Sequence, residues 1–125
     1  MEVFLTKSFA RWRAKQRLSD RALCKAIDEM ERGLIDADLG AGLYKKRVPR
    51  AGAGKSGSYR TLLAVRFGYR AVFLFGFGKN ERDNIDPREQ RALKTFAGLL
   101  LRYGAVEVVH AVTKGELIRL RCSDG

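Results

Sequence analysis

Apolar and polar positions alternate most clearly between residues 58 and 79, which predicts two β-strands joined by a tight turn. Gly68 and Tyr69 separate the two runs, and a glycine at the first central position suits a two-residue hairpin loop. That loop places Phe67 opposite Arg70. One face then carries Thr61, Leu63, Val65, Val72 and Leu74, which are expected to be core. The other face carries Arg60, Leu62, Ala64, Phe73, Phe75, Phe77 and Lys79, with Arg60 opposite Phe77.

Helical spacing of apolar residues precedes and follows this hairpin. Thr6 can cap a first helix that reaches about residue 17, and Ser19 can cap a second. A capping-box sequence at residues 86–89 starts a third helix, which Gly104 closes. The apolar stripe of the first two helices is expected to cover one face of the sheet, and it consists of Phe9, Trp12, Leu23, Ile27 and Met30.

The remaining segments are shorter. Residues 3–5 are either a short strand or a lead-in, residues 34–42 are expected to form a loop, and a basic strand is expected at residues 43–48. Residues 105–113 suit a helix or a strand equally, and residues 116–121 alternate as a last strand does. The sequence therefore predicts one α+β domain over its whole length. It has a small antiparallel sheet, two N-terminal helices on one face, and a C-terminal helix partly over the other.

Composition limits the class of protein. The 125 residues are 46% hydrophobic, which supplies one core, and their net charge of +11 favours a polyanionic partner. No apolar run is long enough to cross a membrane, and charge interrupts the first residues too soon for a secretion signal. A cytoplasmic protein without a membrane partner or cofactor is therefore expected. Cys24 and Cys122 lack CxxC spacing, so free thiols are favoured over a disulfide or a zinc site.

Positive charge is concentrated between Asp38 and Glu81, where no carboxylate occurs. Arg60 and Lys79 fall at the same end of the predicted hairpin, close enough for both to contact one phosphate group. The alternative is that they are ordinary solvated charges at the end of a sheet. The cations of this stretch are Lys45, Lys46, Arg47, Arg50, Lys55, Arg60, Arg66, Arg70 and Lys79.

A glycine-rich loop at residues 50–58 resembles a nucleotide-binding loop only superficially. Gly54, Lys55 and Ser56 copy the end of a Walker A motif, but Pro49 stands where the leading glycine is needed, and a strand follows instead of a helix. The loop is expected either to hold a phosphate backbone through Lys55 or to be a plain exposed linker.

The order of these features resembles the RelE/ParE superfamily of type II toxins, and especially its RelE/HigB-type branch. The resemblance covers nearly the full chain and rests on segments 45–47, 54–57, 59–60, 76–85 and 115–118. It implies a small toxin that blocks translation as an endoribonuclease, cutting mRNA and often doing so on the ribosome. It also implies a neutralising antitoxin encoded beside it.

Carried over by position, Arg60 is the arginine of the central strand and Lys79 is the lysine at the end of the next strand. The basic residues ahead of the central strand, implied to bind RNA, are Lys45, Lys46 and Lys55. Members of the family often place a tyrosine or histidine near the C-terminus for proton transfer. Tyr103 and His110 are in that region but match no motif, so the acid/base group stays open, and we expect His110 to be structural.

RNA carries its own nucleophile, so a cutting protein must bend the chain and neutralise the charge that grows on phosphate. We expect Arg60 to clamp the scissile phosphate beside Lys79, and Arg82 to contact a flanking phosphate. No cluster of carboxylates suggests a metal. Glu81 is either a general base or, more in keeping with an exposed carboxylate, a salt-bridge partner of Arg82 or a neighbour. Tyr59 falls on the opposite face and is expected to be structural.

Phe75 and Phe77 can stack on bases, although packing under the third helix is favoured for at least one of them. Two other functions remain open at this point. One is inhibition of DNA gyrase, as in the ParE branch, which needs no cleavage site. The other is a non-catalytic, basic nucleic-acid-binding module.

Overall fold

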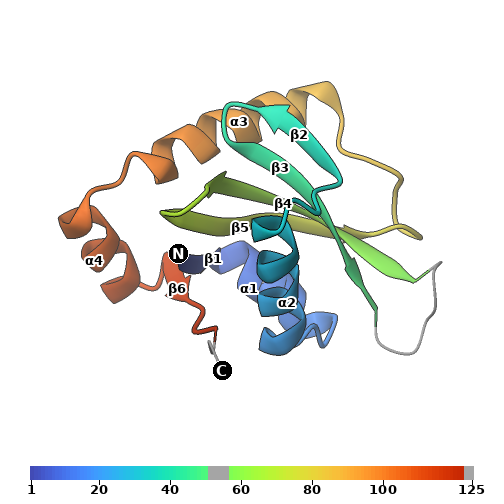
Figure 1. The fold of residues 1–125 in the computed structure, drawn as a ribbon, viewed down its shortest axis with the longest axis horizontal. Coiled ribbons are helices and arrows are strands. Elements are labelled where there is room, and N and C mark those ends of the chain that lie inside the picture. The colour runs from blue at the N-terminus through green and yellow to red at the C-terminus, as the bar shows by residue number, and fades with distance from the viewer. Residues whose placement is uncertain (51–56, 123–125) are drawn as a thin grey trace.

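The computed structural model describes residues 1–50 and 57–122 (Figure 1). The elements are β1 (Glu2–Thr6), α1 (Lys7–Lys15), α2 (Asp20–Glu31), β2 (Ala37–Gly40), β3 (Leu43–Pro49), β4 (Ser58–Arg66), β5 (Arg70–Gly78), α3 (Pro87–Leu101), α4 (Ala105–Thr113) and β6 (Leu117–Arg119). The strands form one sheet in the order β2-β3-β4-β5-β1-β6. Only the β1–β5 pair is parallel among the described strands. The expected α+β architecture is confirmed.

Each face of the sheet is covered by its own pair of helices. The helices α1 and α2 pack on the face that contains Leu63 and Phe73, together with the predicted stripe of Phe9, Leu23, Ile27 and Met30. The helices α3 and α4 cover the face that contains Leu62 and Leu74. Figure 1 shows α3 and α4 running along the side of the sheet away from α1 and α2. Each face of the sheet is apolar and is buried against the apolar sides of two helices, which explains why both faces are covered.

The predicted helix starts are confirmed by their caps. The Thr6 and Ser19 hydroxyl oxygens accept hydrogen bonds from the amides of Phe9 and Ala22, each at 3.2 Å. The Asp86 carboxylate accepts from the Glu89 amide at 2.8 Å. These bonds satisfy backbone donors that have no partner within the first helical turn.

The hairpin loop differs from the prediction. Arg66 faces Arg70, so the loop has three residues, Phe67 to Tyr69, and the expected pairing of Phe67 with Arg70 is wrong. The register then shifts by one residue between Leu62 and Leu63. This β-bulge cancels the error of the turn, because it adds one residue to β5. Arg60 consequently faces Phe77, as predicted.

Between the bulge and the turn the predicted faces of β5 are exchanged. Phe73 packs under α1, 5.0 Å from the ring of Phe9, whereas we expected it on the face of Arg60. Val72 and Leu74 pack on the α3 side instead of the α1 side. A single inserted residue has this effect because side chains alternate between the faces along a strand.

The structure assigns two shorter segments that the sequence left as a loop or undecided. Residues 37–40, expected in a loop, form the edge strand β2, and residues 105–113 form α4. The turn between β2 and β3 passes through three positive φ angles at Gly40, Ala41 and Gly42. A Cβ at Gly42 would lie 2.7 Å from the Leu101 side chain. Glycine, which has no Cβ, therefore allows this turn to pack closely against α3.

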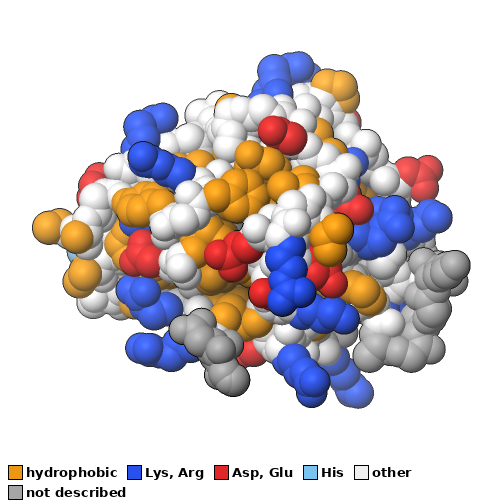
Figure 2. All heavy atoms as spheres, viewed as in Figure 1, with side chains coloured by type: hydrophobic (Ala, Val, Ile, Leu, Met, Phe, Trp, Pro, Cys, Tyr) orange, Lys and Arg blue, Asp and Glu red, His pale blue; other side chains and the backbone are white. Residues whose placement is uncertain are grey.

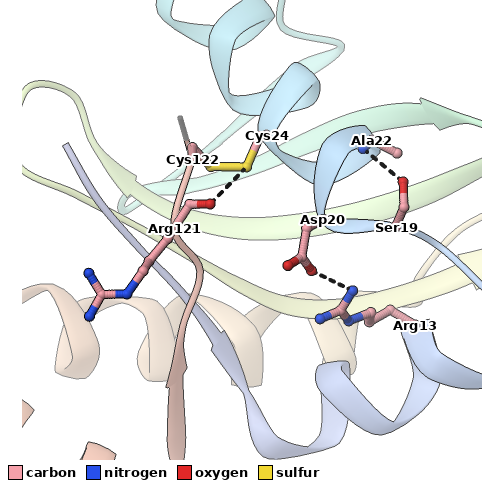
Figure 3. Close-up of a disulfide and its surroundings, with 7 residues drawn as sticks. All are labelled: Arg13, Ser19, Asp20, Ala22, Cys24, Arg121 and Cys122. Carbon is pink, nitrogen blue, oxygen red and sulfur yellow. Dashed lines mark hydrogen bonds and ion pairs between the residues drawn. A yellow bond between two sulfur atoms is a disulfide. The ribbon is translucent and has the colours of Figure 1, made fainter. Parts of the chain in front are cut away.

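The two cysteines form a disulfide, and the expectation of free thiols is wrong. Cys24 on α2 and Cys122 after β6 have Cα atoms 5.5 Å apart, within the usual range for a disulfide. Figure 3 shows the bond joining α2 to the C-terminal segment. A sequence separation of 98 residues gave no local sign of this proximity.

Among the described residues, no helix by itself has the length and apolar character needed to cross a membrane; α3 and α4 meet that test only when taken together, and they are bent by 112°.

Candidate nucleic-acid interface

A row of aligned residues crosses the end of the sheet that is remote from the β4–β5 turn. Arg47 of β3 faces Arg60 of β4, which in turn faces Phe77 of β5. Arg60 is half-buried, and its guanidinium donates to the Ser58 hydroxyl at 3.0 Å. Facing residues project from the same side of a sheet. This row therefore presents two arginines on the α3 side of the sheet.

Lys45 belongs to the next row on the same side. It faces Leu62, which faces Phe75, and it lies two positions from Arg47 along β3. Lys45 is half-buried and Arg47 is exposed. Arg47 was absent from the predicted site, although the same alternation that places Lys45 would have identified it.

Lys79 is exposed and is the first residue after β5, two positions beyond Phe77. It lies at the end of the hairpin where Arg60 is found. Sequence position and hairpin register thus bring the two predicted catalytic cations to one end of the sheet.

Glu81 is held in the tight turn that follows β5. Its carboxylate accepts from the amide of Gly78 at 3.2 Å, and its own amide donates to the Gly78 carbonyl at 3.0 Å. The expected salt bridge of Glu81 to Arg82 or a neighbour is absent in the described part of the chain, and Arg82 pairs with Glu89 instead. A Cβ on Gly78 would lie 2.6 Å from the Asn80 side chain, so glycine permits this close turn.

Arg82 is fixed by aromatic rings on one side and by a carboxylate on the other. Its guanidinium carbon lies 5.3 Å from the ring centres of both Phe75 and Phe77. One of its terminal nitrogens is 2.6 Å from Glu89, and its side chain is 35% exposed. Phe77 is only 2% exposed, so packing, and not base stacking, is the use of that ring. The arrangement keeps a cation in place beside the Arg60 row.

Glu89 has a lowered pKa, first because Arg82 donates to its side chain and then because the Asp86 amide does so. A carboxyl whose pKa is lowered by folding stabilises the fold at every pH above the pKa that it has in the unfolded chain. That contribution is lost as the pH falls through the lowered pKa of the folded state.

We expect Glu89→Gln to reduce the free energy of unfolding at neutral pH. The difference in this free energy between the variant and wild type should disappear in acid. Urea unfolding at both pH values measures this, and a gap that is independent of pH would contradict it.

One predicted RNA-binding lysine, Lys46, does not join this face. Lys46 lies on the opposite side under α2 and is 6% exposed. Its ammonium group is 3.0 Å from the Glu29 carboxylate and donates to the Leu34 carbonyl at 2.9 Å. Lys55 lies outside the described residues. Lys46 therefore serves the packing of α2 on β3.

The residues considered for proton transfer lie elsewhere. The Tyr103 carbonyl accepts from Arg70 at 3.0 Å, at the turn end of β5. His110 is exposed on α4, a helix that Figure 1 shows at the opposite side of the molecule from the end of β3 and the start of β4. Tyr59 packs edge-on against Trp12, with ring centres 5.3 Å apart, which agrees with a structural role. Within residues 1–50 and 57–122 no three His, Cys, Asp or Glu side chains gather as metal ligands do.

Charge is unevenly distributed over the surface. Figure 2 shows Lys and Arg side chains over α1 and α2 and at the edge where β3 ends and β4 begins, while apolar side chains are visible at α4 and across the middle of the view. The strands β3, β4 and β5 contain no Asp or Glu. A phosphate at the Arg60 row would meet cations without a competing carboxylate from these strands.

The family model described as the RelE toxin of the RelE/RelB toxin-antitoxin system matches residues 1–120. No curated protein shows a significant match to the chain. The family match extends over the whole sheet and all the described helices. The chain belongs to the RelE family of toxins of toxin-antitoxin systems.

Proposed function

We propose that this toxin inhibits translation by cutting mRNA at the face that carries Arg60. The observation that supports this most is the register that aligns Arg47, Arg60 and Phe77 on one side of the sheet. Arg82 is held next to that row, over Phe77. Membership of the RelE family makes the chain the toxin of a toxin-antitoxin pair, and the cation row is suited to a phosphate backbone.

The reaction needs no nucleophile from the protein. The 2′-hydroxyl oxygen of RNA attacks the adjacent phosphorus, the bond from phosphorus to the 5′-oxygen breaks, and a 2′,3′-cyclic phosphate and a 5′-hydroxyl result. Arg60 would hold the phosphate and neutralise its growing charge, and Lys79 would stabilise or protonate the leaving oxygen. Glu81, positioned by the Gly78 amide beside Lys79, is the nearest carboxylate in the sequence to accept the 2′-hydroxyl proton.

The family also implies an antitoxin as a partner. We expect an acidic segment of that protein to cover the Arg60 face, because it would relieve the repulsion among the cations there. Binding at this face would exclude RNA and so neutralise the toxin.

Incubating the purified chain with a defined mRNA, with and without ribosomes, tests the proposal. New 2′,3′-cyclic phosphate ends, formed also in the presence of EDTA, are the expected result. Growth arrest with intact mRNA and with DNA relaxation or double-strand breaks would favour inhibition of gyrase instead. Binding of nucleic acid without toxicity would indicate a non-catalytic module.

Lys79→Gln is expected to lower the rate of cleavage by about 100-fold, because one cation is lost from the stabilisation of the transition state. Lys114→Gln is the matched control, since Lys114 is also exposed and lies at the end of α4. Single-turnover cleavage of the same mRNA measures both. Equal rates of cleavage in the two variants would show that Lys79 has no specific role in the reaction.

A further inference from the structure

A second basic site lies on the other side of the sheet from Arg60. A cavity of about 650 Å³ opens between the α1–α2 turn and the ends of β3 and β4. Apolar residues such as Leu18 and Ala26 contribute to its lining. Its lining also includes five cations, which are Lys15, Arg17, Arg21, Lys25 and Arg50. Figure 2 shows the cations of α1 and α2 crowding this face.

Carboxylates near the cavity are already paired with cations outside its lining. Glu29, which lines the cavity, is 3.0 Å from Lys46. Asp20 is 2.7 Å from Arg13. Figure 3 shows this ion pair. Within the described part of the chain, none of the five lining cations forms an ion pair. The cavity is therefore a concave, positively charged surface whose neighbouring acids are already neutralised.

The cations of α2 are regularly spaced. Arg21 and Lys25 are separated by one helical turn, or about 6 Å along the axis, and both are exposed. Arg17 continues the series in the turn before α2, at a φ of +58°. The position after a helix that adopts this conformation is usually glycine, because glycine has no Cβ to strain. An arginine at this position adds a further cation to the lining of the cavity.

The cavity adjoins the proposed cutting face around the end of the β3–β4 ribbon. Pro49 and Ser58 are the last pair of that ribbon, and Pro49 also lines the cavity. The guanidinium carbon of Arg50 lies 5.9 Å from the ring centre of Tyr59. Arg60, which follows Tyr59 in β4, projects to the opposite side of the sheet. The cavity and the Arg60 face thus lie on opposite sides of the sheet at the same end of β3 and β4.

We propose that this cavity is a second RNA subsite, which binds backbone phosphates of the strand whose scissile phosphate lies at Arg60. The inference rests on the proposed function. RNA is favoured over an acidic protein segment because its phosphates recur along the strand, as the cations Arg21 and Lys25 recur one turn apart along α2. The subsite binds without regard to base sequence, since it contacts the backbone.

The test uses the full chain with Arg21→Gln and Lys25→Gln combined. The matched control combines Arg102→Gln and Lys114→Gln, two exposed cations of the same types at the ends of α3 and α4. The probes are 2′-O-methyl RNAs, which lack the nucleophile, as a trinucleotide and as a dodecamer. Thermal unfolding verifies that both variants are folded.

The cavity variant is expected to bind the dodecamer about tenfold more weakly than the control in low salt. The slope of log affinity against log salt concentration should be shallower in this variant, by about 0.7 for each lost phosphate contact. Trinucleotide binding and the cleavage rate at saturating RNA should not change. Such a pattern places the lost contacts outside the cutting face.

Equal affinities of the cavity and control variants for the dodecamer would overturn the subsite while leaving the proposed function intact. If the wild-type chain neither binds nor cuts RNA, the proposed function fails together with it. Loss of binding to poly-glutamate in the cavity variant, with RNA binding retained, would assign the cavity to an acidic protein partner and also overturn the proposal.

Discussion

Arg60→Gln is expected to lower mRNA cleavage by about 1000-fold and to abolish growth arrest. Glutamine keeps much of the side chain's length but removes the charge and the forked donor that we propose contact the phosphate in the transition state. Arg60 is half-buried and donates to Ser58 on its own strand, so its orientation is already set before RNA binds. Single-turnover cleavage of a defined mRNA and growth after induction measure the effect.

Arg66→Gln provides the matched control for this prediction. Arg66 lies on the same strand, six positions from Arg60, and is exposed near the β4–β5 turn. Both variants lose one positive charge, so a general effect of net charge would affect them equally. A similar loss of cleavage in the two variants would mean that Arg60 acts only through the long-range field, and the proposed clamp would be wrong.

Loss of the Cys24–Cys122 disulfide is expected to lower the free energy of unfolding by about 4 kcal/mol. The bond closes a loop with a sequence separation of 98 residues, so it strongly restricts the unfolded chain. The double variant Cys24→Ser with Cys122→Ser avoids leaving a single reactive thiol. Urea unfolding of the oxidised wild type and of this variant gives the difference.

Reduction of the wild type with dithiothreitol should reproduce the loss, and the double variant should be insensitive to the same treatment. An unfolding curve of the wild type that is unchanged by reduction would show that the bond does not stabilise the fold. Because the disulfide anchors α2 to the segment after β6, reduction should also loosen the C-terminal residues first (Figure 3).

Some parts of the structure follow from local chemistry, and these were predictable. Thr6, Ser19 and Asp86 start helices because each side chain bonds an amide three residues away. The Arg60 row was also predictable, but for a partly accidental reason. The turn is one residue longer than expected, and the β-bulge in β5 restores the register before Arg60 is reached.

Other features depend on contacts between segments far apart in the chain. Lys45 and Lys46 have the same charge and adjacent positions, yet Lys46 is buried because Glu29 of α2 lies above it. Glu81 has Arg82 next to it in sequence, but Arg82 pairs with Glu89 at the start of α3. The cavity beside α2 has the same origin, since it combines side chains from two helices and the sheet.

By itself, the sequence determined the helix starts, the alternation of the central strands, the excess of positive charge, and the resemblance to RelE toxins. These depend on neighbouring residues, on composition, or on an ordered set of motifs. Tertiary structure alone decided the bulge, the pairing of Cys24 with Cys122, and which cations of the described residues form ion pairs. The physical reason is that ion pairs, disulfides and burial depend on distances in space, which residue spacing along the chain does not specify.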